Sequence, residues 1–395
     1  MKILHTADWH LGKFVNGFSM LEDQKYILEK LIDSLENNLI DVLVISGDIF
    51  DRAIAPQEAV KLLDETIYKV ILDLNIKILI IPGNHDSAQR LSFASKLYCE
   101  KGLYVFGEFN KKMPSVTLFD EYGPVNFYLL PYFNINQIIA MFEKEQNINK
   151  NEEHNIKTFS DAFNKIIEHN KPFIDLSQRN ILIAHGFFGY LNPENKIFYD
   201  QITSQSEVSV GGTDIIDLSV ADFFDYIALG HLHAPQQIKN SCFRYSGSLL
   251  KYSVDEAKQK KSHVILNCKE KGNMSINLES IKPLRDLRVV RGYMKDLCEC
   301  EDSVNLISDD YVFVELLDED AVFDVVPRLR QTFKNIIGVK MVNRFNTDNT
   351  ITINNVKSKD FTVLFNEFYS DVSGQNVSIE KQNIINSILS LISNE

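Results

Sequence analysis

Five short apolar runs, each followed by polar residues that can ligate a metal ion, constrain the fold of this chain more than any other feature. Continuous apolar runs of this length are typical of strands that are covered on both faces of a sheet. In open α/β sheets, ligands bind beyond the carboxyl ends of the strands. The sequence therefore predicts one sheet edge that gathers aspartate, asparagine and histidine side chains. The runs are 3–7 before Asp8 and His10, 42–46 before Asp48, 78–82 before Asn84, 181–184 before His185, and 225–229 before His231 and His233.

The residue types in these motifs favour a site for two metal ions. Residues two apart on an extended chain point the same way, so the Asp-x-His and His-x-His pairs can each present two ligands. The Asp48 carboxylate can bridge two cations, and Asn84 adds a neutral carbonyl oxygen. Nitrogen and oxygen ligands without thiolate favour Mn, Fe or Zn over Mg alone. Two such ions can clamp a phosphodiester and activate a water molecule. Two other histidines, His5 and His263, lie within expected strands and are predicted to be structural.

Helical periodicity between the apolar runs predicts the fold class. Apolar residues recur at helical spacing over 21–35 and 59–74, and each segment connects two of the predicted strands. Alternation of strand and helix indicates βαβ units and a mainly parallel sheet. The segments 243–248 and 262–266 are expected to complete a second sheet. The predicted fold is α/β, or α+β in detail, with a two-sheet sandwich flanked by helices.

A domain boundary is predicted near Pro283. Strands are expected after it at 287–293, 311–317 and 337–342, with a helix around 323–333, which makes a small α+β capping domain. The last segment of the chain carries an apolar stripe at helical spacing, which either packs on its own domain or docks on the coiled coil of a partner. The stripe is formed by Ile384, Ile385, Ile388, Leu389 and Ile392. The predicted domains are 1–283, 284–356 and a C-terminal helical segment, 357–395.

The chain is acidic, with a formal net charge of −13 over 395 residues. Affinity for nucleic acid that does not depend on sequence comes largely from Lys and Arg at phosphates, so a partner is expected to supply much of it. No apolar run approaches the ~20 residues that span a bilayer, and no signal peptide is recognised, so we expect a cytoplasmic protein without a membrane partner. The five cysteines lack Cys-x-x-Cys spacing, which argues against a disulfide framework.

The order of the motifs resembles that of a known family. Asp-x-His, Gly-Asp-x-x-Asp, Gly-Asn-His-Asp, a strand-end His and Gly-His-x-His follow one another as in the calcineurin-like metallophosphoesterases. Within that superfamily the chain is similar to the SbcD family, the nuclease subunits of bacterial SbcCD complexes. The similarity runs from the first residue to about Pro283 and continues more loosely to the C-terminus. The stretches that carry it are 6–12, 84–87, 90–93 and 228–233.

The resemblance implies a role for each motif residue. His85 matches a catalytic histidine that is not a ligand, and an imidazole can carry a proton near neutral pH. Asp51 matches a residue that orients this histidine, so its carboxylate is expected to accept a hydrogen bond from His85; a structural turn or helix cap is the alternative. Arg52 and Arg90 are candidate phosphate contacts, with solvated surface arginines as the alternative. One metal ion would be held by Asp8, His10, Asp48 and His233, and the other by Asp48, Asn84, His185 and His231.

The resemblance also implies an activity and partners. It implies metal-dependent hydrolysis of DNA, with exonuclease action on duplex ends and endonuclease action on single strands or hairpins, in DNA repair, recombination and replication. Two divalent ions are expected, Mn²⁺ first, with Fe, Zn or Mg as alternatives. The partner would be an SbcC-type coiled-coil ATPase, with this chain as a homodimer in a heterotetramer. The alternatives are a small-molecule phosphodiesterase or protein phosphatase with the same metal core, and a non-catalytic interaction subunit.

Overall fold

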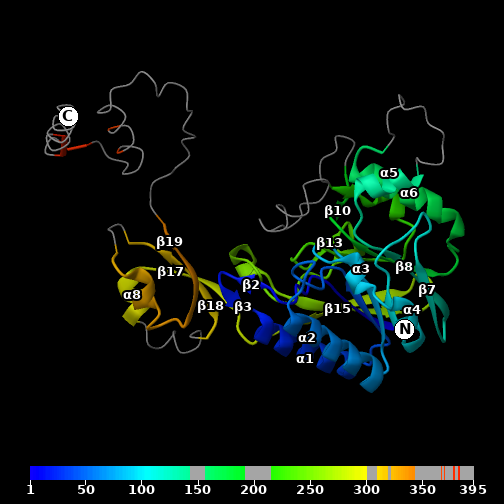
Figure 1. Cartoon of the computed structure of the whole chain (residues 1–395), viewed down its shortest axis with the longest axis horizontal. Coiled ribbons are helices and arrows are strands. Elements are labelled where there is room, and N and C mark those ends of the chain that lie inside the picture. The colour runs from blue at the N-terminus through cyan, green and yellow to red at the C-terminus, as the bar shows by residue number, and fades with distance from the viewer. Residues whose placement is uncertain are drawn as a thin grey trace. The chain divides into compact units, whose positions relative to one another are not determined.

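Two six-stranded sheets form the framework of the first part of the chain (Figure 1). The structure is a computed structural model, and it describes residues 1–142, 156–191, 215–299, 309–318 and 322–342, together with 366, 369, 377, 378, 381 and 382. The chain divides into two units, Met1–Val289 with Asp309–Phe313, and Val290–Ser308 with Val314–Glu395.

The first sheet has a parallel centre, as the alternation of strands and helices predicts. Its strands, in order across the sheet, are β16 (Met274–Ser280), β15 (Ser262–Cys268), β1 (Lys2–Thr6), β4 (Val42–Ser46), β5 (Lys77–Ile81) and β6 (Leu103–Val105). The last four run parallel to one another, whereas β15 runs antiparallel to β1 and β16 antiparallel to β15. Every residue of β4 is buried, which agrees with a strand covered on both faces.

The second sheet also has a parallel centre, between antiparallel edge strands. Its strands, in order, are β13 (Gln236–Ile238), β14 (Asn240–Tyr245), β12 (Tyr226–Gly230), β9 (Arg179–His185), β8 (Gly123–Leu130) and β7 (Ser115–Asp120). The prediction that segment 243–248 contributes to this sheet is confirmed by β14. The same prediction for segment 262–266 is wrong, because β15 pairs with β1 of the first sheet. The central strands of both sheets are covered on both faces. An apolar run therefore predicts a strand but does not indicate which of the two sheets that strand joins.

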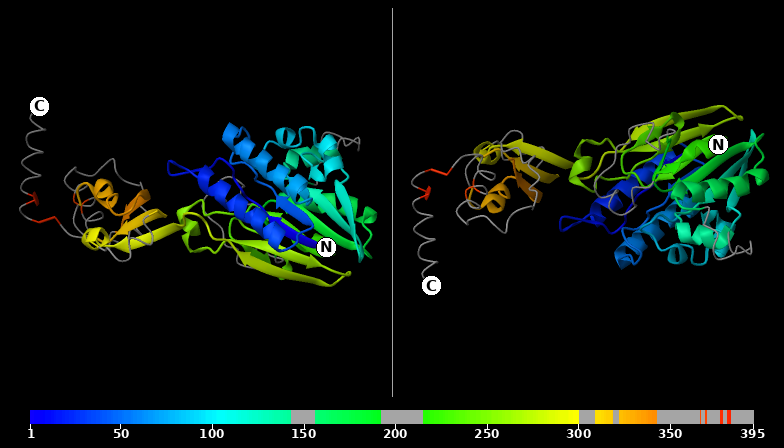
Figure 2. Two further views of the ribbon diagram at one scale, coloured as in Figure 1. Left: turned by 90° about the horizontal axis from the view of Figure 1, so that it is seen from below. Right: turned by 90° about the horizontal axis from the view of Figure 1, so that it is seen from above.

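Helices cover the outer faces of both sheets and give the fold four layers (Figures 1 and 2). α1 (Leu21–Asn37) and α2 (Gln57–Tyr68) lie side by side against the first sheet, and α5 (Ile135–Phe142) and α6 (Phe159–Asn170) lie against the second. α1 buries one face because its apolar residues recur at helical spacing. The residues on that face include Ile27, Leu28, Leu31 and Leu35. The predicted two-sheet sandwich flanked by helices is therefore confirmed.

Two apolar cores hold these layers together. Val44 and Leu79 of the first sheet pack against Ile183 and Ala228 of the second. A separate core lies between the second sheet and the helices α5 and α6, where Phe163 is fully buried. Because aliphatic side chains from both sheets fill the space between them, the relative position of the two sets of strands is fixed by packing.

Shorter elements connect the layers. They are the two-stranded pairs β2 (Phe14–Val15) with β3 (Phe18–Ser19) and β10 (Phe188–Gly189) with β11 (Ile216–Asp217), the helices α3 (Ala88–Leu91) and α4 (Ser95–Tyr98), the π-helical turn η1 (Lys69–Asp73), and the 3₁₀ turns η2 (Cys99–Lys101), η3 (Lys171–Phe173), η4 (Leu218–Ala221) and η5 (Val254–Lys258). The predicted helix at 59–74 corresponds to α2 followed by η1.

A third sheet follows in the later part of the chain. It contains, in order, β17 (Leu287–Gly292), β18 (Tyr311–Leu316) and β19 (Asn335–Met341), close to the ranges that the sequence predicts. α10 (Val325–Leu329) is shorter than the predicted helix at 323–333. It begins after Asp324, whose left-handed φ of 53° a helix cannot include, and it ends at Leu329. α8 (Met294–Glu299) is not predicted by periodicity. Apart from six positions, the predicted segment 357–395 lies outside the described residues.

Two expectations from composition can be compared with this structure. Within the described residues, no helix is long and apolar enough to cross a membrane. The four cysteines among the described residues, Cys99, Cys242, Cys268 and Cys298, are free thiols. Cys300 lies outside the described residues.

Candidate metal centre

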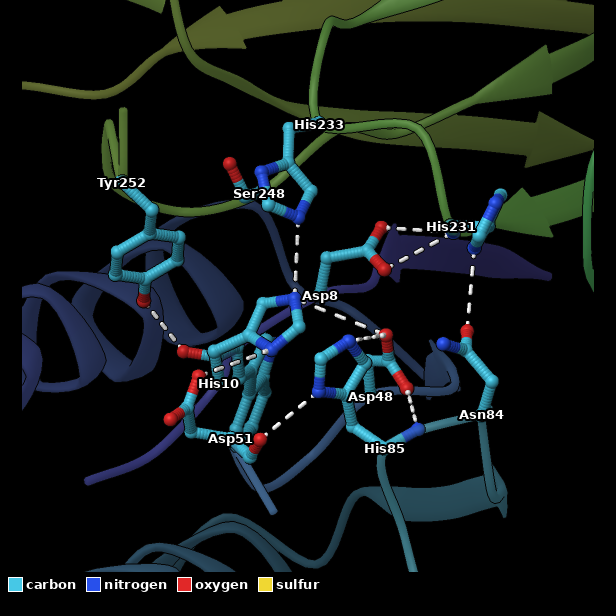
Figure 3. A network of polar contacts seen from close by, with 12 residues as sticks. Asp8, His10, Asp48, Asp51, Asn84, His85, His231, His233, Ser248 and Tyr252 are labelled. Carbon is cyan, nitrogen blue, oxygen red and sulfur yellow. Dashed lines mark hydrogen bonds and ion pairs between the residues drawn. The ribbon is translucent and has the colours of Figure 1, made fainter. Parts of the chain in front are cut away.

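Strand ends from both sheets meet at one edge, where six of the seven predicted ligands lie close together in Figure 3. The seventh, His185, joins them through its ring contact with Asn84. The hydroxyl group of Ser46, at the end of β4, donates to the carbonyl oxygen of Ala228 in β12 at 3.3 Å and links the two sheets. Asp8 and His10 follow β1, Asp48 follows β4, Asn84 follows β5, His185 ends β9, and His231 and His233 follow β12. All seven are buried except Asn84, which is partly exposed.

Two glycines allow the sheets to approach so closely. A Cβ atom on Gly230 would collide with the carbonyl oxygen of Ser46. A Cβ atom on Gly47 would collide with the ring of His185, and Gly47 also has a φ of +92°, which L side chains rarely adopt. The glycines that precede Asp48 and His231 are therefore required by space at this edge.

The loops after β1 and β4 hold their ligands in an uncommon backbone conformation. Asp8, His10 and Asp48 have φ angles of 55°, 45° and 51°, in the left-handed region. Such residues are uncommon outside glycine and persist where the surrounding structure holds them. Here the backbone N–H of Asp8 donates to the carbonyl of Gly47, and that of His10 to the carbonyl of Asp48, each at 3.0 Å. The two loops therefore fix each other, and their side chains turn toward the same space.

A first group of ligand atoms forms around His10 and His233. Their Nε2 atoms lie 3.1 Å apart. Nε2 of His10 also lies 3.7 Å from Oδ2 of Asp48. The carboxylate of Asp8 accepts the backbone N–H of His231 at 2.9 Å, which orients it beside the same group. Neighbouring ligand atoms at about 2.1 Å from one metal ion lie about 3 Å apart, so the spacing of the two imidazole nitrogens suits a shared cation.

A second group of ligand atoms forms around Asn84. Its Oδ1 lies 3.0 Å from Nε2 of His185 and 3.2 Å from Nδ1 of His231. Nε2 of His185 lies 3.5 Å from Oδ2 of Asp48. The same carboxylate oxygen of Asp48 is therefore close to both groups, which is the position that a bridging ligand would take.

Hydrogen bonds on the far side of two rings determine which nitrogen faces the centre. Nδ1 of His185 lies 2.8 Å from the carbonyl oxygen of Ser46, and Nδ1 of His233 lies 2.9 Å from Oε1 of Glu256. Both partners can only accept, so each Nδ1 carries the proton when the ring is neutral and each Nε2 presents a lone pair. Lone pairs, a carboxamide oxygen and carboxylates converge in this space, and this donor set fits divalent cations.

The charges at the centre are strongly perturbed by burial and by one another. Burial raises the pKa of Asp8 to about 7 and lowers the pKa of His231 to about 3. Burial alone would lower the pKa of His185, but the Asp48 carboxylate beside it raises that pKa to about 9. The same contact holds the pKa of Asp48 well below its usual range although burial opposes this. A divalent cation between them would favour the neutral ring and the ionised carboxylates.

His85 lies beside the two groups of ligand atoms and is more exposed than the four histidines among the proposed ligands. Its side chain is 22% exposed, and its Nε2 lies 4.0 Å from Oδ2 of Asp48. Its backbone N–H donates to Oδ1 of Asp48 at 2.9 Å. Nδ1 of the ring lies 2.9 Å from the backbone carbonyl oxygen of Asp51. This carbonyl fixes the ring with Nε2 toward the ligands.

The predicted hydrogen bond from His85 to the Asp51 carboxylate is therefore wrong in its acceptor atom. The carboxylate of Asp51 accepts instead from Nζ of Lys13 at 2.6 Å. The main-chain carbonyl of Asp51, in the loop after β4, faces His85, and the side chain of Asp51 pairs with Lys13, in the segment after β1. Sequence spacing identifies Asp51 as a neighbour of His85, but it does not distinguish a main-chain acceptor from a side-chain acceptor.

The two candidate phosphate contacts differ in position. The side chain of Arg52 is 66% exposed, and its Nε lies 3.7 Å from Oδ2 of Asp51. Arg90 is exposed in α3, the short helix that follows the Gly-Asn-His-Asp motif. Arg52 thus lies next to Asp51, which contacts His85. For Arg90 the structure gives its position in the helix and its exposure.

Three residues that support the centre are not identified by the sequence analysis. Asp86 accepts backbone N–H groups from Gly83, Ile49 and Phe50 and so ties the loops after β4 and β5 together. Its signal is the fourth position of the Gly-Asn-His-Asp motif. Gln24 of α1 donates to the carbonyl of His10 at 2.8 Å, and Glu256 contacts His233. Neither lies in a motif, so no sequence signal points to them.

Comparison with known proteins finds curated relatives over nearly the whole length of this chain. The family model for calcineurin-like phosphoesterases matches residues 1–235. SbcD, a subunit of the nuclease SbcCD, from Staphylococcus epidermidis is 33% identical over 392 residues, which cover 99% of each chain. SbcD from Staphylococcus saprophyticus is 31% identical over 396 residues, covering 100% of this chain and 99% of the relative. A solved dimetal phosphatase from Danio rerio has 11% identity and a TM-score of 0.41, covering 72% of this chain and 98% of its own.

The family model spans more than half of the chain and includes all seven predicted ligands. The two staphylococcal relatives extend the similarity through the later strands to the end of the chain. The chain therefore belongs to the calcineurin-like phosphoesterases and, within them, to the SbcD family of SbcCD nuclease subunits.

Proposed function

We propose that this chain is a metal-dependent DNA nuclease, acting as an exonuclease on duplex ends and as an endonuclease on single strands or hairpins, in DNA repair, recombination and replication. The observation that carries the proposal is the position of Asp48. Its Oδ2 lies 3.7 Å from Nε2 of His10 and 3.5 Å from Nε2 of His185. A carboxylate between two groups of nitrogen and oxygen ligands suits a pair of divalent ions, and such pairs serve phosphodiester hydrolysis.

The proposed ligands fall into two sets that share Asp48. The donors are imidazole, carboxylate and carboxamide without thiolate, a set that favours Mn²⁺, with Fe, Zn or Mg as alternatives. When bound, such ions polarise the phosphodiester and lower the pKa of water. The first set is Asp8, His10, Asp48 and His233, and the second is Asp48, Asn84, His185 and His231.

His85 is proposed as the catalytic residue that is not a ligand. Since its Nδ1 faces the carbonyl of Asp51, Nε2 is the nitrogen that can take up or release a proton. The ring is partly exposed, so a substrate phosphate beside the ligands can reach that atom. His85 would protonate the leaving oxygen or stabilise charge in the transition state. Asp51 is proposed as a positioning residue that acts through its carbonyl oxygen.

Arg52 and Arg90 are proposed to bind DNA phosphates near the centre. Arg52 is exposed beside Asp51, where its guanidinium group could pair with a phosphate next to the scissile bond. Arg90 lies farther along the chain in α3, and its exposed side chain suits a more distant phosphate. Few other contacts of this kind are expected, because the chain carries a net charge of −13.

The proposed organisation follows the relatives, which are described as subunits of SbcCD. Residues 1–283 would form the nuclease domain, 284–356 a capping domain, and 357–395 the segment that binds an SbcC-type coiled-coil ATPase. We propose a homodimer of this chain in a heterotetramer with that ATPase, working on DNA in the cytoplasm. Because the acidic chain is poorly suited to hold a polyanion alone, the partner would contribute much of the affinity for DNA.

An assay of the purified chain on three substrates tests the proposed activity. Linear duplex DNA, single-stranded DNA and a cyclic nucleotide are incubated with Mn²⁺ or with EDTA, with and without a coiled-coil ATPase partner. We expect Mn²⁺-dependent cleavage of DNA, with stimulation by the ATPase and ATP at duplex ends. Hydrolysis of the cyclic nucleotide without cleavage of DNA would favour the small-molecule phosphodiesterase instead. Metal uptake without hydrolysis of any substrate would favour a non-catalytic subunit.

A further inference from the structure

Glu256 is a fully buried carboxylate in the turn η5, next to the proposed ligand His233. Oε1 lies 2.9 Å from Nδ1 of His233 and 3.2 Å from the hydroxyl group of Ser253. Oε2 lies 2.7 Å from Nζ of Lys261. A buried carboxylate is costly unless it is paired and hydrogen-bonded, and both oxygens of Glu256 have partners. Its two principal contacts are thus a histidine of the metal centre on one side and a buried lysine on the other.

Lys261 holds the main chain of His233 as well as the carboxylate. Its Nζ donates to the carbonyl oxygen of His233 at 2.8 Å and to the hydroxyl group of Ser248 at 2.8 Å. The backbone N–H of Ser248 donates to the same carbonyl at 3.1 Å. The ring of His233 is therefore fixed by Glu256, and its backbone is fixed by Lys261 and Ser248. Few degrees of freedom remain for the direction of Nε2.

We infer that Glu256 is a positioning residue for metal binding, which, with Lys261 as its counter-ion, fixes the tautomer and direction of His233. The inference rests on the proposed function, since it deepens the role of one proposed ligand. A carboxylate that accepts from Nδ1–H leaves the lone pair on Nε2, 3.1 Å from Nε2 of His10. It also makes the ring a stronger ligand.

The effect is expected at one ion only. His233 belongs to the set around His10, whereas His185, in the other set, donates its Nδ1–H to the main-chain carbonyl oxygen of Ser46. Loss of a supporting carboxylate behind a metal-bound histidine weakens metal affinity by about 10- to 100-fold. A change at Glu256 should therefore weaken the ion of the His233 set and spare the ion of the His185 set.

Two variants separate this role from a purely structural one. Glu256→Gln alone would leave the Lys261 charge buried without a counter-ion, which destabilises the fold. Glu256→Met combined with Lys261→Met removes both charges, and the acceptor for Nδ1 of His233, at similar volume, so the chain should remain folded. Glu256→Asp keeps the charge but is one methylene shorter, which withdraws it from His233. Lys260→Met is the matched control, because Lys260 is exposed and lines the same cavity of about 260 Å³ as Lys261.

The experiment is calorimetric titration of each metal-free chain with Mn²⁺, together with thermal unfolding in EDTA. We expect two ions in the wild type and in Lys260→Met. The double variant and Glu256→Asp should unfold cooperatively and bind one ion with wild-type affinity and the other about 10- to 100-fold more weakly. If either folded variant binds both ions as the wild type does, Glu256 is structural and the inference fails. A wild-type chain that binds no Mn²⁺ would instead contradict the proposed function itself, and with it this inference.

Discussion

Strand β9 has a buried polar cluster at each of its ends, and the two clusters are built differently. At its start, the guanidinium group of Arg179 donates to both carboxylate oxygens of Asp120 and to the carbonyl oxygens of Gly123 and Lys269. Arg179 is 2% exposed, yet its donors meet a carboxylate and main-chain carbonyls that can only accept. This cluster is complete within the chain.

At its other end, β9 places His185 in a cluster whose acceptors face one another. Nε2 of His185 faces the side-chain oxygen Oδ1 of Asn84 and the carboxylate of Asp48, and nearby Nε2 of His233 faces Nε2 of His10. Facing acceptor atoms repel each other unless a proton or a cation lies between them. One strand thus carries an ion pair with all its partners in the chain at one end, and a cluster suited to a bound cation at the other. We call the first, around Arg179 and Asp120, the closed cluster, and the second, around His185, the open cluster. The balance of donors and acceptors, rather than burial, distinguishes structure from candidate function here, because each cluster contains deeply buried polar side chains.

Removal of the shared carboxylate should give the largest effect. Asp48→Ala removes the ligand atom close to both groups, so we expect loss of both ions and a fall in DNA cleavage of about 10⁴-fold or more, which corresponds to several kcal/mol. The cluster at Arg179 is untouched, so metal-free unfolding should stay near that of the wild type. Bound Mn²⁺, cleavage rate and unfolding temperature in EDTA are the measurements. Retention of two ions would contradict the bridging assignment.

Breaking the closed cluster should have the opposite pattern. Arg179→Met leaves the Asp120 carboxylate, whose side chain is 14% exposed, without its guanidinium partner. Removal of one partner of a buried pair costs about 3–5 kcal/mol when the remaining charge is uncompensated. The N-terminal ammonium group of Met1 still lies 2.7 Å from Oδ2 of Asp120. We therefore expect the free energy of unfolding in denaturant titrations to fall by less than that amount. At a temperature where the variant is folded, its Mn²⁺ stoichiometry should remain that of the wild type. A loss of metal in the folded variant would show that the two ends of β9 are coupled.

His85 sharpens the comparison inside the open cluster, since it lies there without being a proposed ligand. His85→Gln should keep both ions and the affinity for DNA, while the turnover number falls by about 100-fold, the lower range for loss of a general acid or base. Asn84→Ala is the contrasting variant, because the Oδ1 it removes faces two ring nitrogens of the second set. That variant should lose one ion. A metal-free His85→Gln would mean that the ligand assignment is wrong.

Much of this comparison could be predicted from the sequence, because strand ends carry their own signal. Apolar runs that stop at Asp8, Asp48 and His185 predict the strands and the edge at which their ends meet. The histidines within strands are also distinguishable: His5, predicted to be structural, is buried with Nδ1 3.0 Å from the hydroxyl group of Tyr226. These features depend on residue type and on the spacing of apolar residues along a short segment, and both can be read directly from the sequence.

The supporting residues could not be predicted, because their partners are distant in the chain. Glu256 reaches His233 only because η5 folds back beside the loop after β12. Arg179 in β9 contacts Asp120 in β7 across the one strand between them, β8, and the two residues are 59 positions apart in the chain. Asp51 is identified by its motif, but the choice between its carbonyl and its carboxylate depends on backbone direction. Hydrogen-bond partners of this kind are set by tertiary packing, for which periodicity gives no information.

The smallest effect concerns the pH dependence of the closed cluster. The guanidinium group of Arg179 holds the pKa of Asp120 well below its usual value of 3.8, although partial burial opposes this. A carboxyl group with a depressed pKa in the folded state stabilises the fold above its unfolded pKa, and this stabilisation is lost as the pH falls toward the folded pKa.

The variant Asp120→Asn lacks this titration but keeps an acceptor for Arg179. The free energy of unfolding of the wild type should exceed that of the variant by about 1–2 kcal/mol above pH 5. The difference should shrink steadily below about pH 4. We would measure this difference in the free energy of unfolding by parallel denaturant titrations of the two chains between pH 3 and 7. EDTA is present so that the metal centre makes no contribution. A difference that is constant over this range would show that Arg179 does not hold the carboxylate of Asp120 ionised.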